Sequence, residues 1–415
     1  MSARLSSFSQ TLSVETAFDV LAVAKRLKAT GKDVIELQIG DSPFPATKSA
    51  KDFAIRAVQH DESHYCASTG LLSFRESVAR FMGEEFCVKV DAANVVVTPG
   101  AKVLEQFFCE AVCDAGDSVL VFSPHFPTYP PNIERRGARA WYVPLKQENA
   151  FRPDPKEVER FVREAPNPKA IILNSPHNPT GGVATLQDLQ AIADIVRGKN
   201  IFICSDEPYC HMAWKERHHS ILECSGMLEQ TVAVYTFSKS YSMSGYRLGF
   251  GVTTPQLADV ISKLVNTSLS CVPPIIQLAG QAALEKDHAE RDETMLKFKR
   301  KVELLVGALK KVPDVRVEMP AGTFYVFPDV SKICQKLKIL SHGLALYLLE
   351  AADDRFGVAC LGGECFGPAG QGFLRFSCAE PDERLVKAIE FFADAIKRED
   401  RVGKFLEARP QYRMK

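Results

Sequence analysis

Short apolar runs alternate with longer amphipathic stretches over the middle of the chain, from about residue 94 onward. The apolar runs are Val95–Thr98, Ser118–Phe122, Ala140–Val143, Ala170–Asn174, Ile201–Ser205 and Thr231–Tyr235. Stretches between them, such as 101–114 and 185–198, repeat their apolar residues with the period of a helix. Continuous apolar runs suit strands buried on both faces, and their alternation with helices predicts a mostly parallel sheet covered by helices. We therefore expect a large α/β domain over residues 46–320.

The pattern differs toward both ends of the chain. Residues 14–30 predict an amphipathic helix closed by Gly31, a short strand should follow at Val34–Ile39, and residues 71–88 predict a second helix. Beyond Gly322 the expected strands are Thr323–Pro328, Gly357–Leu361 and Gly372–Cys378, and the expected helices are 341–351 and 382–398. These elements predict a smaller α+β domain over residues 321–415, completed by residues 1–45. We expect the basic and polar stretch 398–415 to fray.

Composition and charge narrow the class of protein. The 415 residues include 51 basic and 51 acidic side chains, so the net charge is zero, which argues against nucleic acid or an anionic membrane as a partner. No apolar run is long enough to span a bilayer, and the first residues lack the apolar core of a signal peptide. The twelve cysteines form no Cys-x-x-Cys pair, so we expect free thiols and no metal site. A cytoplasmic enzyme is the simplest interpretation.

The most informative stretch surrounds Lys239, just after a predicted strand in a segment poor in other charges. Hydroxyl residues Thr236 and Ser238 precede this lysine, and Arg247 follows eight residues later. Hydroxyls and a guanidinium are the groups that bind a phosphate. A lysine amine beside a phosphate-anchored aldehyde is what a Schiff-base cofactor requires.

Three further segments lie at the ends of predicted strands. Asn174–Gly181 (NSPHNPTG) forms a loop at the carboxyl end of a strand, where open α/β sheets bind ligands. Ser205–Tyr209 (SDEPY) places a carboxylate where it could keep a pyridine nitrogen protonated. Thr98–Lys102 (TPGAK) puts small residues at a helix start, where backbone N–H groups can approach a phosphate. Each segment is weak alone, since a plain turn or a helix cap explains it equally well.

Together the order and spacing of these segments resemble the class I/II aminotransferases of the fold-type I pyridoxal 5′-phosphate (PLP) enzymes. The resemblance runs from about Thr16 to Ala395, and the S-K-x₇-R pattern at Lys239 is its most specific part. It implies an enzyme that moves an amino group from an L-amino acid to a 2-oxo acid, with 2-oxoglutarate as the usual acceptor. PLP is the implied cofactor.

The resemblance also implies a role for particular residues. Lys239 would carry the cofactor as a Schiff base and would transfer the proton as general base and then acid. Asp206 would pair with the pyridine nitrogen, Phe126 would stack on the ring, and Asn178 would contact its 3′-oxygen. The remaining cofactor contacts implied by the resemblance are Tyr209 at the 3′-oxygen and, at the phosphate, Gly100, Ala101, Lys102, Thr236, Ser238 and Arg247.

Further matches concern the substrate and the assembly. Arg375 matches the arginine that clamps the substrate α-carboxylate, and Gly40 and Asn178 would reach the same group. Tyr65 matches the tyrosine that crosses to the phosphate of a neighbouring subunit, which implies a homodimer with shared active sites. An arginine that binds a distal carboxylate in animal aspartate aminotransferases is missing ahead of Pro273. Lys102 is a possible substitute, so the side-chain preference stays open.

Two alternatives use the same cofactor machinery or the same fold. One is a PLP-dependent lyase, such as a β-eliminase or an aminocyclopropane-carboxylate-type synthase, which these motifs barely separate from a transaminase. The other is a PLP-sensing transcription regulator without enzymatic activity. Such a regulator carries a DNA-binding domain ahead of this fold, whereas only about 40 residues precede Gly40 here.

Overall fold

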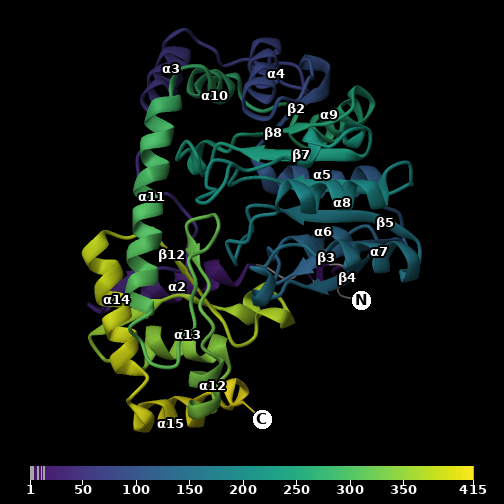
Figure 1. Ribbon diagram of the computed structural model, residues 1–415. Coiled ribbons are helices and arrows are strands. Elements are labelled where there is room, and N and C mark those ends of the chain that lie inside the picture. The colour runs from purple at the N-terminus through teal and green to yellow at the C-terminus, as the bar shows by residue number, and fades with distance from the viewer. Residues whose placement is uncertain (1–3, 7–8, 11, 13–14, 415) are drawn as a thin grey trace.

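A seven-stranded sheet forms the centre of the computed structural model, which describes residues 4–6, 9–10, 12 and 15–414 (Figure 1). Its strand order is β2-β8-β7-β6-β5-β3-β4. The strands are β2 (Val95–Thr98), β3 (Ser118–Ser123), β4 (Arg139–Pro144), β5 (Pro168–Asn174), β6 (Phe202–Asp206), β7 (Thr231–Thr236) and β8 (Gly249–Val252). Neighbouring strands run parallel from β7 to β4, and only β8 is antiparallel to its neighbours. The predicted mostly parallel sheet is therefore confirmed.

Both faces of the sheet are buried over its inner strands, as the continuous apolar runs predict, whereas the edge strand β4 is mostly exposed or half-buried. In β3, Val119 and Val121 belong to a core shared with α5, whereas Leu120 and Phe122 belong to a core on the other face. Such alternation follows from the two-residue period of a strand. The helices around the sheet are α5 (Ala101–Val112), α6 (Tyr129–Glu134), α7 (Pro155–Glu164), α8 (Leu186–Val196) and α9 (Pro255–Leu269).

A second group of helices lies beyond the β2 edge of the sheet. It consists of α3 (Lys48–Gln59), α4 (Leu72–Phe86) and α10 (Pro274–Lys286), which pack on one another (Figure 1). The helix predicted over 71–88 is thus confirmed as α4, while α3 has no counterpart among the predicted elements. From α10 the chain enters the long helix α11 (His288–Leu309), which runs down to the C-terminal elements.

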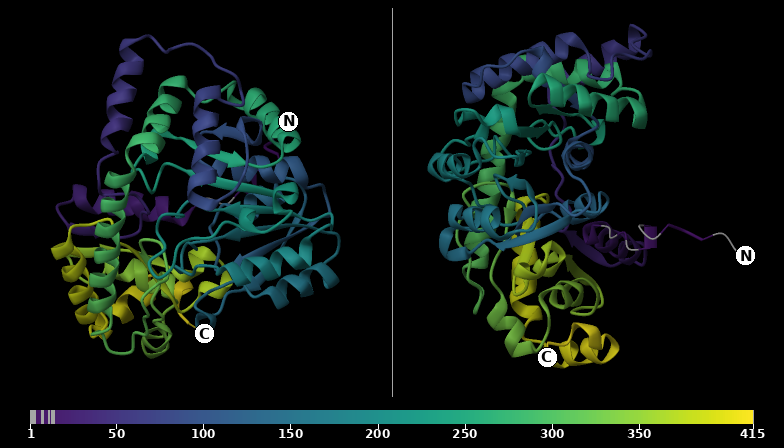
Figure 2. Two further views of the ribbon diagram at one scale, coloured as in Figure 1. Left: turned by 45° about the horizontal axis from the view of Figure 1, so that its top comes forward. Right: turned by 90° about the vertical axis from the view of Figure 1, so that its right-hand side faces the viewer.

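The C-terminal part contains two small sheets and four helices. The chain contributes β9 (Tyr325–Val326), β10 (Phe356–Ala359), β11 (Leu361–Gly362), β12 (Leu374–Ser377), α12 (Ser331–Leu337), α13 (Ser341–Glu350), α14 (Asp382–Ala395) and α15 (Glu399–Ala408). One sheet has the antiparallel order β11-β12-β9, and in the other β10 pairs in parallel with β1 (Asp33–Glu36). The N-terminal helix α2 (Thr16–Ala29) packs beside β1, β10 and β11, so the first elements of the chain lie against the last (Figure 2).

Several boundaries differ from the predicted ones. The strand expected over Val34–Ile39 ends at Glu36, and the first residue of the helix expected over 14–30 lies outside the described residues. The expectation that 398–415 frays is wrong, because α15 buries Val402, Phe405 and Leu406 against the C-terminal core. Its charged residues fall on the outer face, so the segment reads as polar although one face is apolar.

The structure bears on three features: disulfide bonds, membrane-spanning helices and metal sites. All twelve cysteines are free. Within the described part of the chain, no helix is long and apolar enough to cross a membrane. Among the same residues, no group of histidine, cysteine or acidic side chains could hold a metal ion.

Candidate functional site

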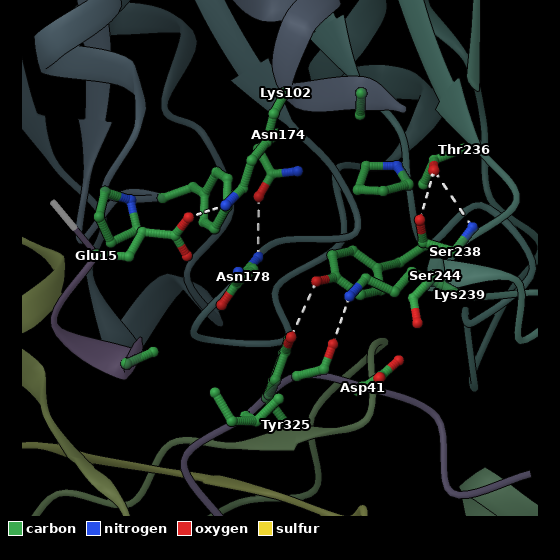
Figure 3. A pocket seen from close by; sticks show the side chains of 18 of the residues that line it. Glu15, Asp41, Lys102, Asn174, Asn178, Thr236, Ser238, Lys239, Ser244 and Tyr325 are labelled. Atoms are coloured by element: carbon green, nitrogen blue, oxygen red, sulfur yellow. Dashed lines mark hydrogen bonds and ion pairs between the residues drawn. The ribbon is translucent and has the colours of Figure 1, made fainter. Parts of the chain in front are cut away.

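A pocket of about 430 Å³ opens at the carboxyl ends of the central strands. Its walls come from the N-terminal segment, from the loops after β5, β6 and β7, from the start of α5, and from the C-terminal part (Figure 3). The predicted site residues that line it are Gly40, Ala101, Lys102, Phe126, Asn178, Asp206, Tyr209, Thr236, Ser238, Lys239, Arg247 and Arg375. Twelve of the fourteen predicted residues thus meet in one cavity, and Gly100 and Tyr65 are the two that do not line it.

Lys239 lies in the turn that follows β7, where the strand delivers it to the pocket. Its Nζ atom donates a hydrogen bond to the carbonyl oxygen of Gly40. The same atom lies 5.8 Å from the ring centroid of Tyr209 and 5.7 Å from that of Phe324. The amine is therefore held by the N-terminal segment on one side and by aromatic rings on the other.

Hydroxyl groups, a guanidinium and a helix start surround one end of the pocket. The Thr236 hydroxyl lies 3.0 Å from the Ser238 hydroxyl, and Arg247 is fixed by donating to the carbonyl oxygens of Ser244 at 2.8 Å and Pro99 at 3.2 Å. The first backbone N–H groups of α5 have no partner within the helix. This combination of donors is suited to a phosphate.

Gly100, at the N-cap of α5, explains how Arg247 approaches this helix start. Its φ is +90° and its ψ is 173°, a conformation that is nearly restricted to glycine. A Cβ atom here would lie 2.5 Å from Nη2 of Arg247. Gly100 therefore does not line the cavity itself, but the absence of a side chain leaves room for the Arg247 guanidinium.

Asp206, the last residue of β6, is buried at the bottom of the pocket. Its Oδ2 atom accepts hydrogen bonds from the Tyr129 hydroxyl at 2.6 Å and from Asn174 Nδ2 at 3.3 Å. Its Oδ1 atom is buried without a hydrogen-bond partner. Burial raises the pKa of Asp206 to about 7, although the bond from Tyr129 opposes the shift. A cationic donor at Oδ1 would satisfy this oxygen and favour the ionised carboxylate.

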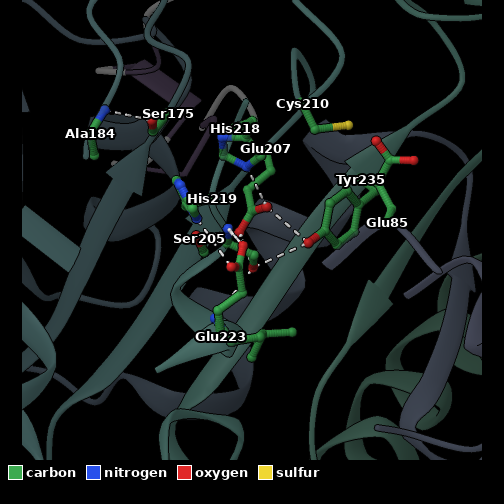
Figure 4. Close-up of polar contacts among 12 residues, drawn as sticks. Glu85, Ser175, Ala184, Ser205, Glu207, Cys210, His218, His219, Glu223 and Tyr235 are labelled. Carbon is green, nitrogen blue, oxygen red and sulfur yellow. Dashed lines mark hydrogen bonds and ion pairs between the residues drawn. The ribbon is translucent and has the colours of Figure 1, made fainter. Parts of the chain in front are cut away.

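Glu207, next to Asp206, points away from the pocket into a polar cluster (Figure 4). Its carboxylate accepts from Ser205 and Ser220, lies 2.8 Å from Nε2 of His218, and accepts from the Tyr235 hydroxyl at 2.8 Å. Four partners satisfy this buried acid, so it anchors the end of β6 and the loop that follows. Because the end of β6 is anchored in this way, the backbone that carries Asp206 is held in place and its side chain stays directed toward the pocket.

Arg375, on β12, forms the opposite wall and is 4% exposed. Its guanidinium donates to Asn178 Oδ1 at 3.1 Å and to the carbonyl oxygen of Gln38 at 2.5 Å. Its Nε atom is buried without a hydrogen-bond partner. The guanidinium lies 4.4 Å from the ring centroid of Tyr325 and 4.9 Å from that of Phe366. A preoriented guanidinium with spare donor capacity suits a carboxylate ligand.

Tyr325 is a pocket residue that the sequence motifs did not single out. Its hydroxyl lies 3.1 Å from the hydroxyl of Tyr209, and a Cβ atom at Gly40 would lie only 1.8 Å from the Tyr325 oxygen. A residue with a side chain at position 40 would therefore clash with Tyr325, so glycine is required there. The sequence places Tyr325 in the predicted strand Thr323–Pro328 but in no motif that marks it as a binding residue.

Glu15 and Phe18 are two further lining residues that the motifs did not reveal. Glu15 forms an ion pair with Lys102, whose ammonium lies 5.4 Å from the ring centroid of Phe126 and 5.6 Å from that of Phe18. Burial lowers the pKa of Lys102. The ammonium of Lys102, which the sequence suggests as a substitute for the missing distal-carboxylate arginine, is therefore engaged by Glu15 of the N-terminal segment.

Tyr65 does not line the cavity of its own chain. It is 86% exposed in the segment between α3 and α4. Ile55, Val58 and Leu72 of the same region are also more than half exposed. Exposed large apolar side chains are typical of protein–protein interfaces.

Comparisons with known proteins agree with this geometry. The model of the family described as aminotransferase class I and II matches residues 32–392. A probable aspartate/prephenate aminotransferase of Aquifex aeolicus is 35% identical over 91% of this chain and 94% of its own length. An aspartate aminotransferase of Pyrococcus horikoshii is 31% identical over 89% and 92%. The structure of a Thermus thermophilus aspartate aminotransferase with maleate superposes with a TM-score of 0.88 at 29% identity, covering 95% of this chain and all of that one.

Proposed function

The chain belongs to the class I and II aminotransferase family, and from this premise we propose that its pocket binds both the cofactor and the substrates of amino-group transfer. The protein is a PLP-dependent aminotransferase, as are its relatives. The observation that carries the proposal for the site is the unpartnered Oδ1 of Asp206, facing a pocket that also contains Lys239. A buried acceptor without a partner is costly unless a ligand supplies a donor.

The residues present fit the cofactor at each of its polar groups. Asp206 would hold the ring nitrogen, and Phe126 would stack on the ring. The phosphate would bind to the donors at the start of α5 together with Thr236, Ser238 and Arg247, while Tyr209 and Asn178 would contact the 3′-oxygen. When bound, the cofactor supplies an aldehyde for covalent attachment of amines and an electron-withdrawing ring that stabilises negative charge at the substrate Cα.

The chain's own groups then bind the substrate and move its proton. Arg375 would clamp the α-carboxylate with its guanidinium, helped by Asn178 and by the backbone at Gly40. Lys239 would hold the cofactor covalently and, once released, would remove the proton from the substrate Cα as a base and deliver it as an acid to C4′ of the cofactor. A 2-oxo acid, with 2-oxoglutarate as the proposed acceptor, would occupy the same carboxylate site in the second half of the cycle.

We further propose a homodimer in which Tyr65 binds the cofactor phosphate of the neighbouring subunit. The support is the exposure of Tyr65 between α3 and α4, two helices that also carry exposed large apolar side chains, and its position outside the pocket of its own chain. Reduced compartments keep thiols free, and all twelve cysteines are free, so we also propose a cytoplasmic location.

The relatives reported above carry aminotransferase names, and this disfavours the lyase alternative. A half-reaction separates the two reactions directly. The holoenzyme is given one amino acid and no acceptor, and the cofactor spectrum and the released products are followed. Transamination converts the cofactor to its pyridoxamine form and releases a 2-oxo acid, whereas release of ammonia or a thiol without that conversion would refute it.

The role of Lys239 is tested with Lys239→Ala. We expect this variant to lose the absorbance of covalently bound cofactor and nearly all turnover, because the amine that attaches the cofactor and moves the proton is removed. Far-UV circular dichroism should remain that of the wild type, since the side chain lies at the pocket and not in the core. Normal turnover by the variant would contradict the proposal.

A further inference from the structure

Glu15 occupies the N-cap of α2, yet its carboxylate makes no hydrogen bond to that helix. Acidic side chains at helix starts usually satisfy the free N–H groups there. Here the side chain instead reaches Lys102 on α5 and accepts a hydrogen bond from Nζ (Figure 3). The side chain of Glu15 is only 15% exposed, against 42% for that of Lys102. The N-terminal segment therefore delivers a partly buried carboxylate into the pocket.

The ion pair uses the one pocket cation that has no other side-chain role. The described cationic residues that line the pocket are Lys102, Lys239, Arg247 and Arg375. In the proposed function Lys239 attaches the cofactor, Arg247 binds its phosphate and Arg375 binds the substrate α-carboxylate. Only the Lys102 ammonium remains for a charged substrate side chain, and Glu15 already neutralises it.

A second carboxylate at Lys102 is unfavourable for an electrostatic reason. One ammonium cannot neutralise two carboxylates, so an acidic side chain would either meet the repulsion of Glu15 or have to displace it. Repulsion of the wrong ligand is an efficient source of specificity. 2-Oxoglutarate, which carries a distal carboxylate, would bind only with Glu15 displaced.

The same pocket also has apolar walls that suit an uncharged side chain. Phe18 follows Glu15 on α2 and places its ring 5.6 Å from the Lys102 ammonium. Leu361 and Phe366 of the C-terminal part line the same pocket. An apolar side chain gains by burial against these groups and leaves the ion pair intact.

We propose that Glu15 is a specificity-determining residue, which occupies Lys102 and thereby selects amino acids with uncharged, apolar side chains over acidic ones. The inference rests on the proposed function and specifies the substrate class of that same site. It assigns to the N-terminal segment a role in substrate choice.

The test compares the half-reaction of wild type and Glu15→Gln with phenylalanine and with glutamate. We expect the wild type to prefer phenylalanine, and the variant to raise the glutamate-to-phenylalanine ratio of kcat/KM about fivefold, because Lys102 becomes available. Asp19→Asn is the matched control, since Asp19 is exposed on the same helix and its loss changes the charge equally. The control should leave the ratio at its wild-type value.

Ligand binding supplies a readout that does not depend on turnover. Titration of the holoenzyme with succinate and with 3-phenylpropionate, followed by calorimetry, compares a dicarboxylate with an apolar monocarboxylate. Glu15→Gln should tighten succinate binding about fivefold relative to 3-phenylpropionate.

The outcomes separate this inference from the function on which it rests. An unchanged ratio in Glu15→Gln, or a wild type that already prefers glutamate, overturns the role of Glu15 while amino transfer stands. If neither amino acid reacts with the wild type, and further donors also fail, the proposed function is refuted. Independently of turnover, equal succinate affinities of variant and wild type would overturn the inference, whereas tighter binding by the variant would support the role of Glu15 at Lys102.

Discussion

Gly100 illustrates how a residue without a side chain can decide the geometry of a binding site. Its positive φ and the 2.5 Å separation of a built Cβ from Arg247 leave no room for another residue. We expect Gly100→Ala to displace the guanidinium and to weaken cofactor binding at least about tenfold, since a charge-assisted hydrogen bond is lost. The measurement is the dissociation constant of PLP, from fluorescence titration of the apoenzyme.

Gly116→Ala provides the matched control for this prediction. Gly116 has the same φ of +90°, but a Cβ atom there would meet nothing within 4 Å. Both variants should lose stability through backbone strain of about 1–3 kcal/mol, and only the first should lose cofactor affinity. Equal affinities in the two variants would show that strain alone, and not Arg247, matters at this position.

The residues at the ends of the predicted strands predict most of the residues that line the pocket. Asp206 and Thr236 are the last residues of β6 and β7, Lys239 lies three residues after β7, and the carboxyl ends of parallel strands meet at one edge of a sheet. Glu15 and Tyr325 could not be found in this way. They reach the pocket through the packing of α2 and β9 against distant parts of the chain, and no local pattern records that packing.

At the scale of elements, α15 is a helix whose apolar face holds it to the body of the protein. Phe405 is 5% exposed, and its ring centroid lies 5.9 Å from that of Tyr347 and 6.2 Å from that of Tyr412. We expect Phe405→Ala to lower the free energy of unfolding by about 3–5 kcal/mol, as is usual for a buried phenylalanine. Urea denaturation measures the change.

Lys404→Ala is the control for α15, because Lys404 is exposed on the same helix. It should change the free energy of unfolding by no more than about 0.5 kcal/mol. A Phe405→Ala variant as stable as wild type would mean that α15 frays in solution, as the polar composition of this segment first indicates.

Strands that consist of a continuous apolar run can be predicted from the sequence, whereas strands that contain glycine cannot. Strands β2, β3 and β7 begin at their predicted residues, because each is an apolar run between turns. Strand β8 (Gly249–Val252) was missed, since two of its four residues are glycine and favour no strand. Gly251 is needed there because a Cβ would lie 2.8 Å from Leu104.

At the scale of the whole molecule, the proposed dimer makes a prediction about shared sites. If Tyr65 serves the neighbouring subunit, a hybrid of a Lys239→Ala subunit with a Tyr65→Ala subunit has one site with both residues and one with neither. We expect the separately tagged, purified hybrid to show about half the activity of the wild-type dimer, because the subunits contribute independent sites. The assay is the steady-state rate of amino transfer.

The parent homodimers serve as controls for the hybrid. The Lys239→Ala homodimer should be inactive, and the Tyr65→Ala homodimer should bind the cofactor more weakly. If Tyr65 instead served its own subunit, each half of the hybrid would lack one residue. The hybrid would then be no more active than the mean of its parents.

The parallel pairing of β1 with β10 has a consequence for the order of events during synthesis. Asp33 pairs with Phe356, about 320 residues further along the chain. Ribosomes add about 5–20 residues per second, so the first strand waits roughly 16–64 s for its partner to be made. Buried residues such as Val34 and Ile35 stay without their final neighbours throughout this interval. The N-terminal segment therefore reaches its final packing only when translation is almost finished.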